Sequence, residues 1–590
     1  MEVLDPVWGT PVDPATTPFT VERWGSTYYF VDAQQRRKFQ EGARVAYFSM
    51  EVGLRSNIPT YSGGLGVLAG DMIRSASDLH IPMVAVTRVN RMGYFRQEVT
   101  ATGEQVAHPD PWDPAKFMRE LPQTVGVRIG PREVRVKAWI YDYQNSTGSL
   151  TLVLFLDTDV EGNSDEDRQI ASFLYGGDDI YRLKQAIVLG IGGVRMLDAL
   201  GITVLKYHMN EGQSSLLALV LLRRNGKDPD TTRDRCVFTT HTPVSTAFYS
   251  FPYETVHALI GDEFDLEGIR EYAGKEQFNT TTLALAMSTY VNGVAEEHRE
   301  SSRRLFPGYH IRAITNGVHP YTWTSAPFRD LFDRHFHGWA HEPELLVRID
   351  TVPSDEIHRA HLKAKAALLR YILTTTGTRL ELNTLTIGFA RRMTAYKRAA
   401  LLFSDLDRLK KALRWGPFQV VMAGKAHPQD GPGKELIREI YAAKEALKGV
   451  VEVVFLENYN IDLAALMVSG SDIWLNTPIP PLEASGTSGM KAAFNGVVNF
   501  SVLDGWWVEG WVEDDTGWAI GPVPDAPVNV RERRTMELDD LYSKLEYIIV
   551  PKFYNEKDNW ATMMQNSIGK IAYYFNTHRM MRRYVSEAYL

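Results

Sequence analysis

The chain has 590 residues, with 64 lysine and arginine residues against 72 aspartate and glutamate residues, which gives a formal net charge of −8 at pH 7. Hydrophobic residues make up 44% and charged residues 23%, and these proportions exclude a disordered or fibrous protein. The mild acidity argues against a nucleic-acid partner, and no apolar stretch approaches the ~18 residues that cross a membrane. The acidic start, residues 1–5, lacks the basic and apolar regions of a signal peptide, so we expect a cytoplasmic enzyme without a membrane partner.

Strands followed by helices recur through the first half of the chain. Apolar runs predict strands at 43–50, 81–87, 134–141, 150–157, 204–209 and 236–240, and helical spacing predicts helices from a glycine-rich turn at 62–66 to residue 79, at 167–200 and at 214–224. Because parallel strands need crossover helices, this order predicts a mostly parallel sheet that is covered on both faces.

A second series of the same kind begins after turn-rich residues at 316–320, which we interpret as a boundary. Its strands are predicted at 384–390, 418–423, 451–456, 472–476 and 497–503, and its helices at 399–414, 435–448 and 462–468. The predicted fold class is α/β, with two doubly wound Rossmann-like domains, 1–318 and 319–559, that face a central cleft. Residues 560–590 have helical spacing and are predicted to pack across both domains.

Three loops at the predicted carboxyl ends of strands carry residues that suit anions. Ser62-Gly63-Gly64-Leu65-Gly66 enters a helix, so its backbone amides would cradle a phosphate, although a tight turn that needs glycine explains the loop equally well. Residues 391–398 hold four cations directly after a strand, which favours anion binding over a solvated helix face. A serine, glycine and threonine loop ends in Lys491, and a desolvated lysine loses its proton readily, as a Schiff base requires. A helix cap with a snorkelling lysine is the alternative for this third loop.

Histidines and the single cysteine complete the chemical inventory. Cys236 alone excludes an intrachain disulfide and a multi-cysteine metal cage, and no histidine and carboxylate spacing resembles a metal site, so we expect no metal. His208 and His241 follow predicted strands, and we expect both to point into the cleft, where they would bond sugar hydroxyls or act as acid or base. A lone histidine is more often structural, and that alternative stays open.

Taken in order, the motifs point to one family. Gly-Gly-Leu-Gly at 63–66, Arg-Arg-x4-Lys-Arg at 391–398, Glu-Asn-Tyr at 457–459 and Glu-Ala-Ser-Gly-Thr-x-x-Met-Lys at 483–491 closely resemble the α-glucan phosphorylases of glycosyltransferase family 35, in their short bacterial or archaeal form. The resemblance runs from about residue 43 to the C-terminus. It implies a GT-B fold and pyridoxal 5′-phosphate bound as an imine to Lys491. It also implies phosphorolysis of an α-1,4-glucan from the non-reducing end, which gives α-glucose 1-phosphate with retained configuration.

The resemblance also assigns roles to individual residues. Its catalytic positions correspond to Lys491, Arg392, Lys397 and Glu483. Its cofactor-binding positions correspond to Lys491, Gly64, Thr487, Ser488, Lys397 and Asn460. Its substrate-binding positions correspond to His241, Asn316, Glu483, Ser485, Gly486, Tyr396 and Arg392. The implied partners are an α-glucan, inorganic phosphate or glucose 1-phosphate, and a second copy of the chain in a homodimer.

Several positions depart from the family pattern. Asn460 stands where the long enzymes carry a phosphate-binding arginine, Gln213 and Thr394 replace histidines, and Arg391 replaces a lysine. These changes motivate one alternative, a non-catalytic glucan-binding homologue. The other alternative is a nucleotide-sugar-dependent GT-B glucan synthase. Against the synthase stand Tyr61, at a position where synthases have a lysine, and the presence of Lys491, which synthases lack.

Overall fold

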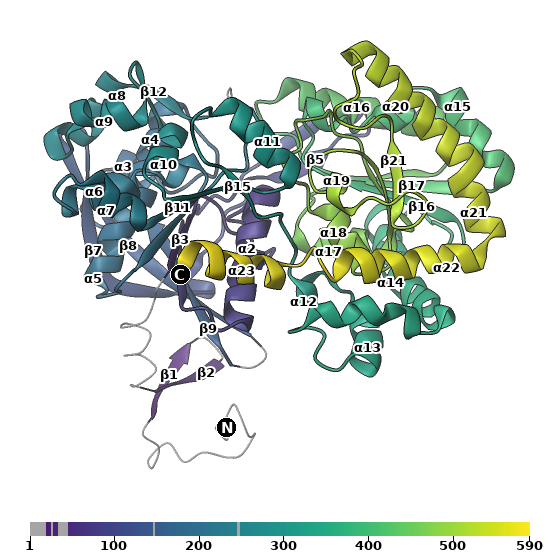
Figure 1. Ribbon diagram of the computed structural model, residues 1–590, viewed down its shortest axis with the longest axis horizontal. Helices are drawn as coiled ribbons and strands as arrows, with labels where there is room; N and C mark the ends of the chain where they lie inside the picture. Colours follow the sequence, from purple (N-terminus) through teal and green to yellow (C-terminus); the bar gives the residue numbers. More distant parts are fainter. Residues whose placement is uncertain (1–18, 25–26, 33–44, 146–147, 245–247) are drawn as a thin grey trace.

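The computed structural model describes residues 19–24, 27–32, 45–145, 148–244 and 248–590. Within these residues the strands build two large sheets, which lie on opposite sides of the molecule in Figure 1 with helices around each. The order of the first sheet is β15-β14-β11-β10-β3-β4-β9-β8-β7, and the order of the second is β18-β17-β16-β19-β20-β21. Both contain the parallel pairs that the alternation of strands and helices predicts, and the α/β class is confirmed.

The first sheet is parallel from β15 to β9 and ends in an antiparallel pair of strands. Its strands are β3 (Val45–Ser49), β4 (Met83–Arg88), β7 (Arg119–Ile129), β8 (Arg132–Gln144), β9 (Leu150–Asp157), β10 (Lys206–Asn210), β11 (Cys236–Thr239), β14 (Tyr290–Gly293) and β15 (Arg312–Ala313). Strands β3, β4 and β11 are buried along their whole length, because apolar side chains pack on both faces of the sheet.

The second sheet is parallel throughout its described strands. They are β16 (Leu385–Ala390), β17 (Phe418–Ala423), β18 (Val453–Leu456), β19 (Ile473–Asn476), β20 (Val498–Val502) and β21 (Gly517–Ile520). A smaller antiparallel hairpin, β5 (Arg96–Val99) and β6 (Gln105–His108), reaches from the first half to the second, where the Gln97 and Gln105 side chains bond the backbone of Gly424 and Ala426.

Two predicted helices differ from the structure. The expected helix at 167–200 is interrupted after the short α3 (Asp165–Arg168) and resumes at α4 (Asp179–Ile187), since Tyr175 and Gly177 between them have φ values of 57° and 68° that no helix contains. It then passes through a π-helical stretch, Val188–Gly192, into α5 (Gly193–Ala199). The expected helix at 399–414 is reduced to α15 (Leu406–Lys411), which Asp405 caps, between short 3-10 turns.

Other helices lie close to the prediction or were missed. α2 (Gly64–Asp78) follows the glycine loop, and α6 (Leu217–Arg224), α16 (Gly431–Ala446) and α17 (Ile461–Gly470) fall in predicted segments. The long α14 (Ser354–Thr376) and the capped α20 (Val530–Lys544) were not predicted, although α14 buries Ile357, Ala364 and Leu368 at helical spacing. The short α18 (Ser488–Ala493) begins within the serine, glycine and threonine loop that ends in Lys491. No described helix is long and apolar enough to span a bilayer.

The C-terminal segment touches both halves of the molecule. α22 (Lys557–Asn566) packs on α14, and α23 (Thr577–Tyr584) returns across the centre of Figure 1 to pack on α2. The chain crosses between the two halves at two points, and these lie side by side. Val318 at the first crossing forms a β-bridge with Asn576 at the second. A Cβ on Gly317 would lie 2.2 Å from the Asn576 backbone, so this close approach of two strands of chain requires glycine.

Candidate active site

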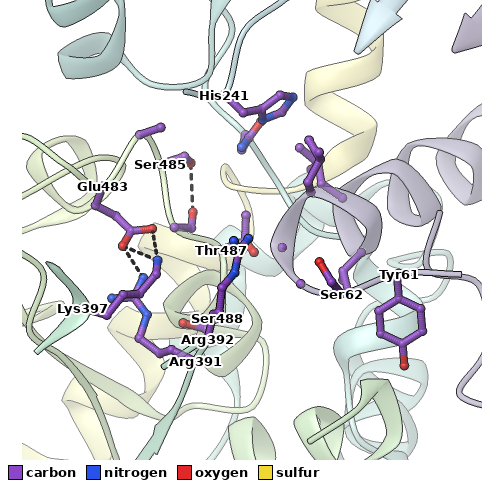
Figure 2. A pocket seen from close by; sticks show the side chains of 18 of the residues that line it. Tyr61, Ser62, His241, Arg391, Arg392, Lys397, Glu483, Ser485, Thr487 and Ser488 are labelled. Atoms are coloured by element: carbon purple, nitrogen blue, oxygen red, sulfur yellow. Dashed lines mark hydrogen bonds and ion pairs between the residues drawn. The ribbon is translucent and has the colours of Figure 1, made fainter. Parts of the chain in front are cut away.

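A cavity of about 360 Å³ is lined by residues from both halves of the chain. Its walls are loops that follow β3, β10, β11 and β15 in the first sheet and β16, β17, β18 and β19 in the second, where a parallel sheet binds ligands. Figure 2 shows Glu483 on one wall of the cavity and Ser62, next to α2, on the other wall. Every residue to which the family resemblance assigns a role lies in this lining: Gly64, His241, Asn316, Arg392, Tyr396, Lys397, Asn460, Glu483, Ser485, Gly486, Thr487, Ser488 and Lys491.

Glu483 is the centre of a charged cluster in the cavity. Lys397 Nζ donates to its two carboxylate oxygens at 3.0 and 2.7 Å, and Arg391 donates to Oε2 at 2.5 Å. Burial by itself would raise the pKa of Glu483, but Arg391 and Lys397 outweigh it and lower that pKa to about 2. The carboxylate therefore stays charged and fixed, and it can still accept a hydrogen bond from a sugar hydroxyl.

Lys491 lies in a different environment in the same cavity. It is on α18 with 7% of its surface exposed, and its Nζ lies 4.0 Å from the centre of the Trp323 ring. Among the described residues no carboxylate or carbonyl pairs with this nitrogen. Burial lowers the pKa of Lys491 to about 8, with Asp71 acting in the opposite direction. Roughly a tenth of this lysine is therefore uncharged at pH 7, far more than of a solvated lysine, and the uncharged amine is the nucleophilic form.

In the loop at the start of α2, the packing around the residues, rather than an unusual backbone conformation, explains where glycine is required. Gly63 has a φ of −169°, which any residue can adopt, and Gly64 is not among the residues with positive φ. A Cβ on Gly64 would meet no atom within 4 Å, whereas one on Gly66 would lie 2.7 Å from Tyr61. Glycine is thus required by packing only at Gly66, and the space beside Gly64 is open at the N-terminus of a helix, where anions bind.

Arg392 is the cation nearest that loop. A Cβ on Gly63 would lie 3.6 Å from Nη2 of Arg392, and Figure 2 shows the arginine between Ser488 and Ser62. The side chain is exposed to the cavity, and it makes no hydrogen bond or ion pair with the residues that the structure describes. An arginine whose fork is free, beside a helix N-terminus, suits the oxygens of a phosphate group.

The wall from the first sheet carries polar groups that suit hydroxyls. His241 Nε2 donates to Asn210 Oδ1 at 2.7 Å, and burial lowers the pKa of this histidine to about 3, so its Nδ1 is a free acceptor. Asn316 Oδ1 and Gln213 Oε1 are buried and have no hydrogen-bond partner among the described residues. Buried acceptors without donors are costly, so a ligand with several hydroxyl groups would satisfy this wall.

His208 does not line the cavity, and the expectation that it would do so is wrong. It is fully buried in β10, where it contacts Tyr589 Oη at 2.7 Å and Thr239 Oγ1 at 2.8 Å. Side chains alternate across a strand, and the His208 side chain lies on the face that the C-terminal segment covers. Its role is structural.

Several predicted residues already have partners in the protein. Asn460 Oδ1 accepts from Leu463 N at 2.9 Å and so caps α17, which is the local reason for an asparagine at this position. Ser488 Oγ accepts from the Trp474 indole at 2.9 Å, and Ser485 Oγ donates to the Gly486 carbonyl. Gly486 has a φ of 72°, which favours glycine in the turn of this loop.

Sequence reasoning missed other residues of the lining. Glu211 is buried and accepts from His241 N at 2.5 Å and Thr242 Oγ1 at 2.9 Å, which fixes the loop after β11. Lys425 donates to the Phe95 carbonyl at 2.7 Å, and burial lowers its pKa to about 8. Their position after β10 and β17, at the carboxyl ends of strands, was the available signal.

Comparison with known proteins gives a consistent family. Residues 253–521 match the profile of the family described as carbohydrate phosphorylase. The chain is 38% identical to maltodextrin phosphorylase of Thermococcus litoralis, over 92% of this chain and 70% of that protein. The chain belongs to the carbohydrate phosphorylase family. Glycogen phosphorylases of Mycobacterium tuberculosis, 35% identical over 92% of this chain and 70% of theirs, and of Aquifex aeolicus, 33% identical over 92% and 86%, are also similar to it.

Proposed function

We propose that this chain is an α-glucan phosphorylase that depends on pyridoxal 5′-phosphate. It transfers the terminal glucosyl unit of an α-1,4-glucan, at the non-reducing end, to inorganic phosphate and gives α-glucose 1-phosphate with retained configuration. The observation that carries the proposal is Lys491, a buried lysine that has no counter-ion among the described residues and shares one cavity with Arg392, which forms no ion pair with them either. Relatives named maltodextrin phosphorylase and glycogen phosphorylase support the substrate class.

The residues present fit the cofactor. Lys491 Nζ is free to carry its aldehyde carbon, because the Trp323 face rather than a carboxylate adjoins this nitrogen. The open space beside Gly64 at the N-terminus of α2 fits a phosphate group, and Thr487, Ser488, Lys397 and Asn460 complete the proposed cofactor site. When bound, the cofactor would supply a second phosphate that passes a proton to and from the substrate phosphate.

The chain's own residues would bind and orient the reactants. Arg392 would hold the substrate phosphate near the scissile bond, since its guanidinium has no competing partner in the described structure. Glu483, Asn316 and His241 would accept hydrogen bonds from glucosyl hydroxyls, with Ser485 and Gly486 beside them. Tyr396 would face the acceptor part of the glucan. Fixed charges at this point stabilise positive charge that develops on the leaving glucosyl group.

The architecture of the proposed enzyme follows the GT-B pattern. We assign 1–318 to a glucan-side domain, 319–559 to a cofactor-side and phosphate-side domain, and 560–590 to a helical segment that spans both. The two sheets, the cavity lined from both and the contacts of α22 and α23 support this division. A homodimer is the proposed assembly.

Two other functions remain as outcomes of the test. In the synthase, a lysine would stand at Tyr61, whose hydroxyl here accepts from Ile461 N at 3.1 Å and joins the two halves. A non-catalytic homologue would bind maltodextrin without turnover.

The full chain, loaded with cofactor, is given maltoheptaose and inorganic phosphate, and the release of α-glucose 1-phosphate is followed by proton NMR. Release supports the proposal, glucan binding without release supports the non-catalytic homologue, and glucan extension only with a nucleotide sugar supports the synthase.

A further inference from the structure

Beneath Lys491 lies a buried polar group on α2 that the proposed catalytic roles do not use. Asp71 is 1% exposed, and its Oδ2 accepts from the Trp323 indole nitrogen at 2.7 Å and from His319 N at 3.2 Å. Its Oδ1 accepts from Arg74 at 3.0 Å, one helical turn further along α2. Arg74 in turn donates to the Leu54 carbonyl at 2.6 Å. Every oxygen of the Asp71 carboxylate is therefore occupied.

These contacts place one aromatic ring. Trp323 is fully buried at the end of α12 (Pro320–Trp323), and its indole is held at the nitrogen by Asp71 while its ring face lies 4.0 Å from Lys491 Nζ. A second carboxylate on the same helix, Asp78, holds the start of this segment through the His319 ring at 2.7 Å. Two carboxylates of α2 thus fix residues 319–323, but only Asp71 touches the ring that adjoins the lysine.

The same group acts on Lys491 electrostatically. Within the described structure, Asp71 and Arg74 are the charged groups that act on this lysine: the first favours its protonated form and the second disfavours it. Because the two charges form a buried ion pair, their effects on Lys491 oppose one another, and burial is the largest cause of its lowered pKa. Removal of either charge would upset this balance in opposite directions.

We propose that Asp71 is a positioning residue for the cofactor lysine: it fixes the Trp323 ring against Lys491 and, paired with Arg74, balances the charge around it. This inference rests on the proposed function, since it concerns the attachment of pyridoxal 5′-phosphate to Lys491. Attachment joins the lysine nitrogen to the aldehyde carbon with loss of one water, and it requires the unprotonated amine. Asp71 acts through Trp323 and through charge, without contact with the reacting atoms.

The test measures attachment rather than turnover. The full chain is freed of cofactor and mixed with pyridoxal 5′-phosphate at a series of pH values, and the rate of attachment is followed by absorbance. Borohydride trapping and peptide mass analysis identify the modified lysine. Asp71→Asn keeps the shape of the side chain and removes its charge, and Asp78→Asn is the matched control: the same change on the same helix, holding the same segment, without contact with Trp323.

Each variant has a distinct expected result. In Asp71→Asn the pH midpoint of attachment falls by about 0.5 units or more, because Arg74 is left unopposed, and the maximal rate falls about 10-fold as the ring loosens. Arg74→Gln shifts the midpoint upward. Trp323→Phe lowers the maximal rate and leaves the midpoint in place, and Asp71→Asn in that background lowers the rate little further, since both act on one ring. Asp78→Asn keeps the midpoint of the unmodified chain.

Failure takes a different form for each claim. Equal behaviour of Asp71→Asn and Asp78→Asn, or midpoint shifts of the same sign for Asp71→Asn and Arg74→Gln, would overturn the positioning role. If Arg74→Gln fails to fold, as judged by circular dichroism, the comparison of the two aspartate variants still decides. Absence of any attachment to Lys491 in the unmodified chain would instead contradict the proposed function.

Discussion

The two ends of the loop from Glu483 to Lys491 face the same cavity but treat charge differently. At one end Lys397 is locked to both oxygens of Glu483, at 3.0 and 2.7 Å. At the other end Lys491 faces an aromatic ring, and burial lowers its pKa to about 8. A paired lysine remains a fixed cation that orients a ligand, whereas an unpaired, desolvated lysine becomes a nucleophile. Partners, rather than residue type, separate the two roles.

Removal of the Lys491 amine is expected to have the largest effect on the enzyme. Lys491→Ala is expected to abolish covalent attachment of pyridoxal 5′-phosphate and to lower phosphorolysis by about three orders of magnitude or more. The assay is the release of glucose 1-phosphate, with thermal unfolding as a check on the fold. Lys425→Ala is the matched control, because Lys425 is a second, half-buried lysine of the cavity with a pKa of about 8. A Lys491→Ala protein that retains both cofactor and activity would refute its assignment.

Neutralising Glu483 removes the counter-ion of Lys397, which then lacks a paired carboxylate as Lys491 does. Glu483→Gln leaves Arg391 and Lys397 without their carboxylate and is expected to lower kcat about 100-fold, because fixed charge beside the glucosyl group is lost. Cofactor attachment to Lys491 should persist in this variant, and absorbance of the bound cofactor checks it. Simultaneous loss of cofactor would mean that the two ends do not act independently.

The same carboxylate makes stability depend on pH. The pKa of Glu483 falls from 4.5 to about 2 on folding, so its contribution is present above about pH 4.5 and disappears as the pH falls through about 2. The shift corresponds to about 3 kcal/mol of unfolding free energy. Urea unfolding between pH 5 and 3 should therefore show a steeper loss of stability in the unmodified chain than in Glu483→Gln. Parallel curves would remove Glu483 from this account.

Arg392, the proposed phosphate ligand, lies outside the loop from Glu483 to Lys491, and its substitution is expected to have a smaller effect on activity. Arg392→Ala is expected to raise the KM for inorganic phosphate about 10-fold and to leave the KM for maltoheptaose nearly unchanged. Arg392→Lys should recover part of the loss, since charge is kept and the planar fork is not. Equal changes in both KM values would indicate a general distortion of the cavity instead.

The smallest effect is expected at the cavity rim. Asn460→Ala removes the cap of α17 and should cost about 1 kcal/mol of stability, whereas Asn460→Asp keeps the cap. Thermal unfolding of the two variants separates them. Asn460→Arg places an arginine where the long enzymes have one, and any gain in phosphate affinity would come with the loss of the same cap. Full stability of Asn460→Ala would show that the cap is dispensable.

The sequence predicted those parts of the fold and site that have a local pattern. Strands such as β16 and β19 are mostly apolar because both faces of the sheet are buried, and their ends located the loops that carry Arg392 and Glu483. β21 is apolar as well but only four residues long, and it was missed. Asp71 and Trp323 gave no local signal at all: they are separated by 252 positions, and their contact exists only after α2 and α12 pack together.

The most direct test of the central claim asks which lysine carries the cofactor. The protein is isolated with pyridoxal 5′-phosphate, reduced with borohydride and digested, and each lysine peptide is weighed. We expect a phosphopyridoxyl group on Lys491, with Lys397 and Lys425 unmodified. Modification of Lys397, or an unmodified Lys491 in the presence of ample cofactor, would contradict it.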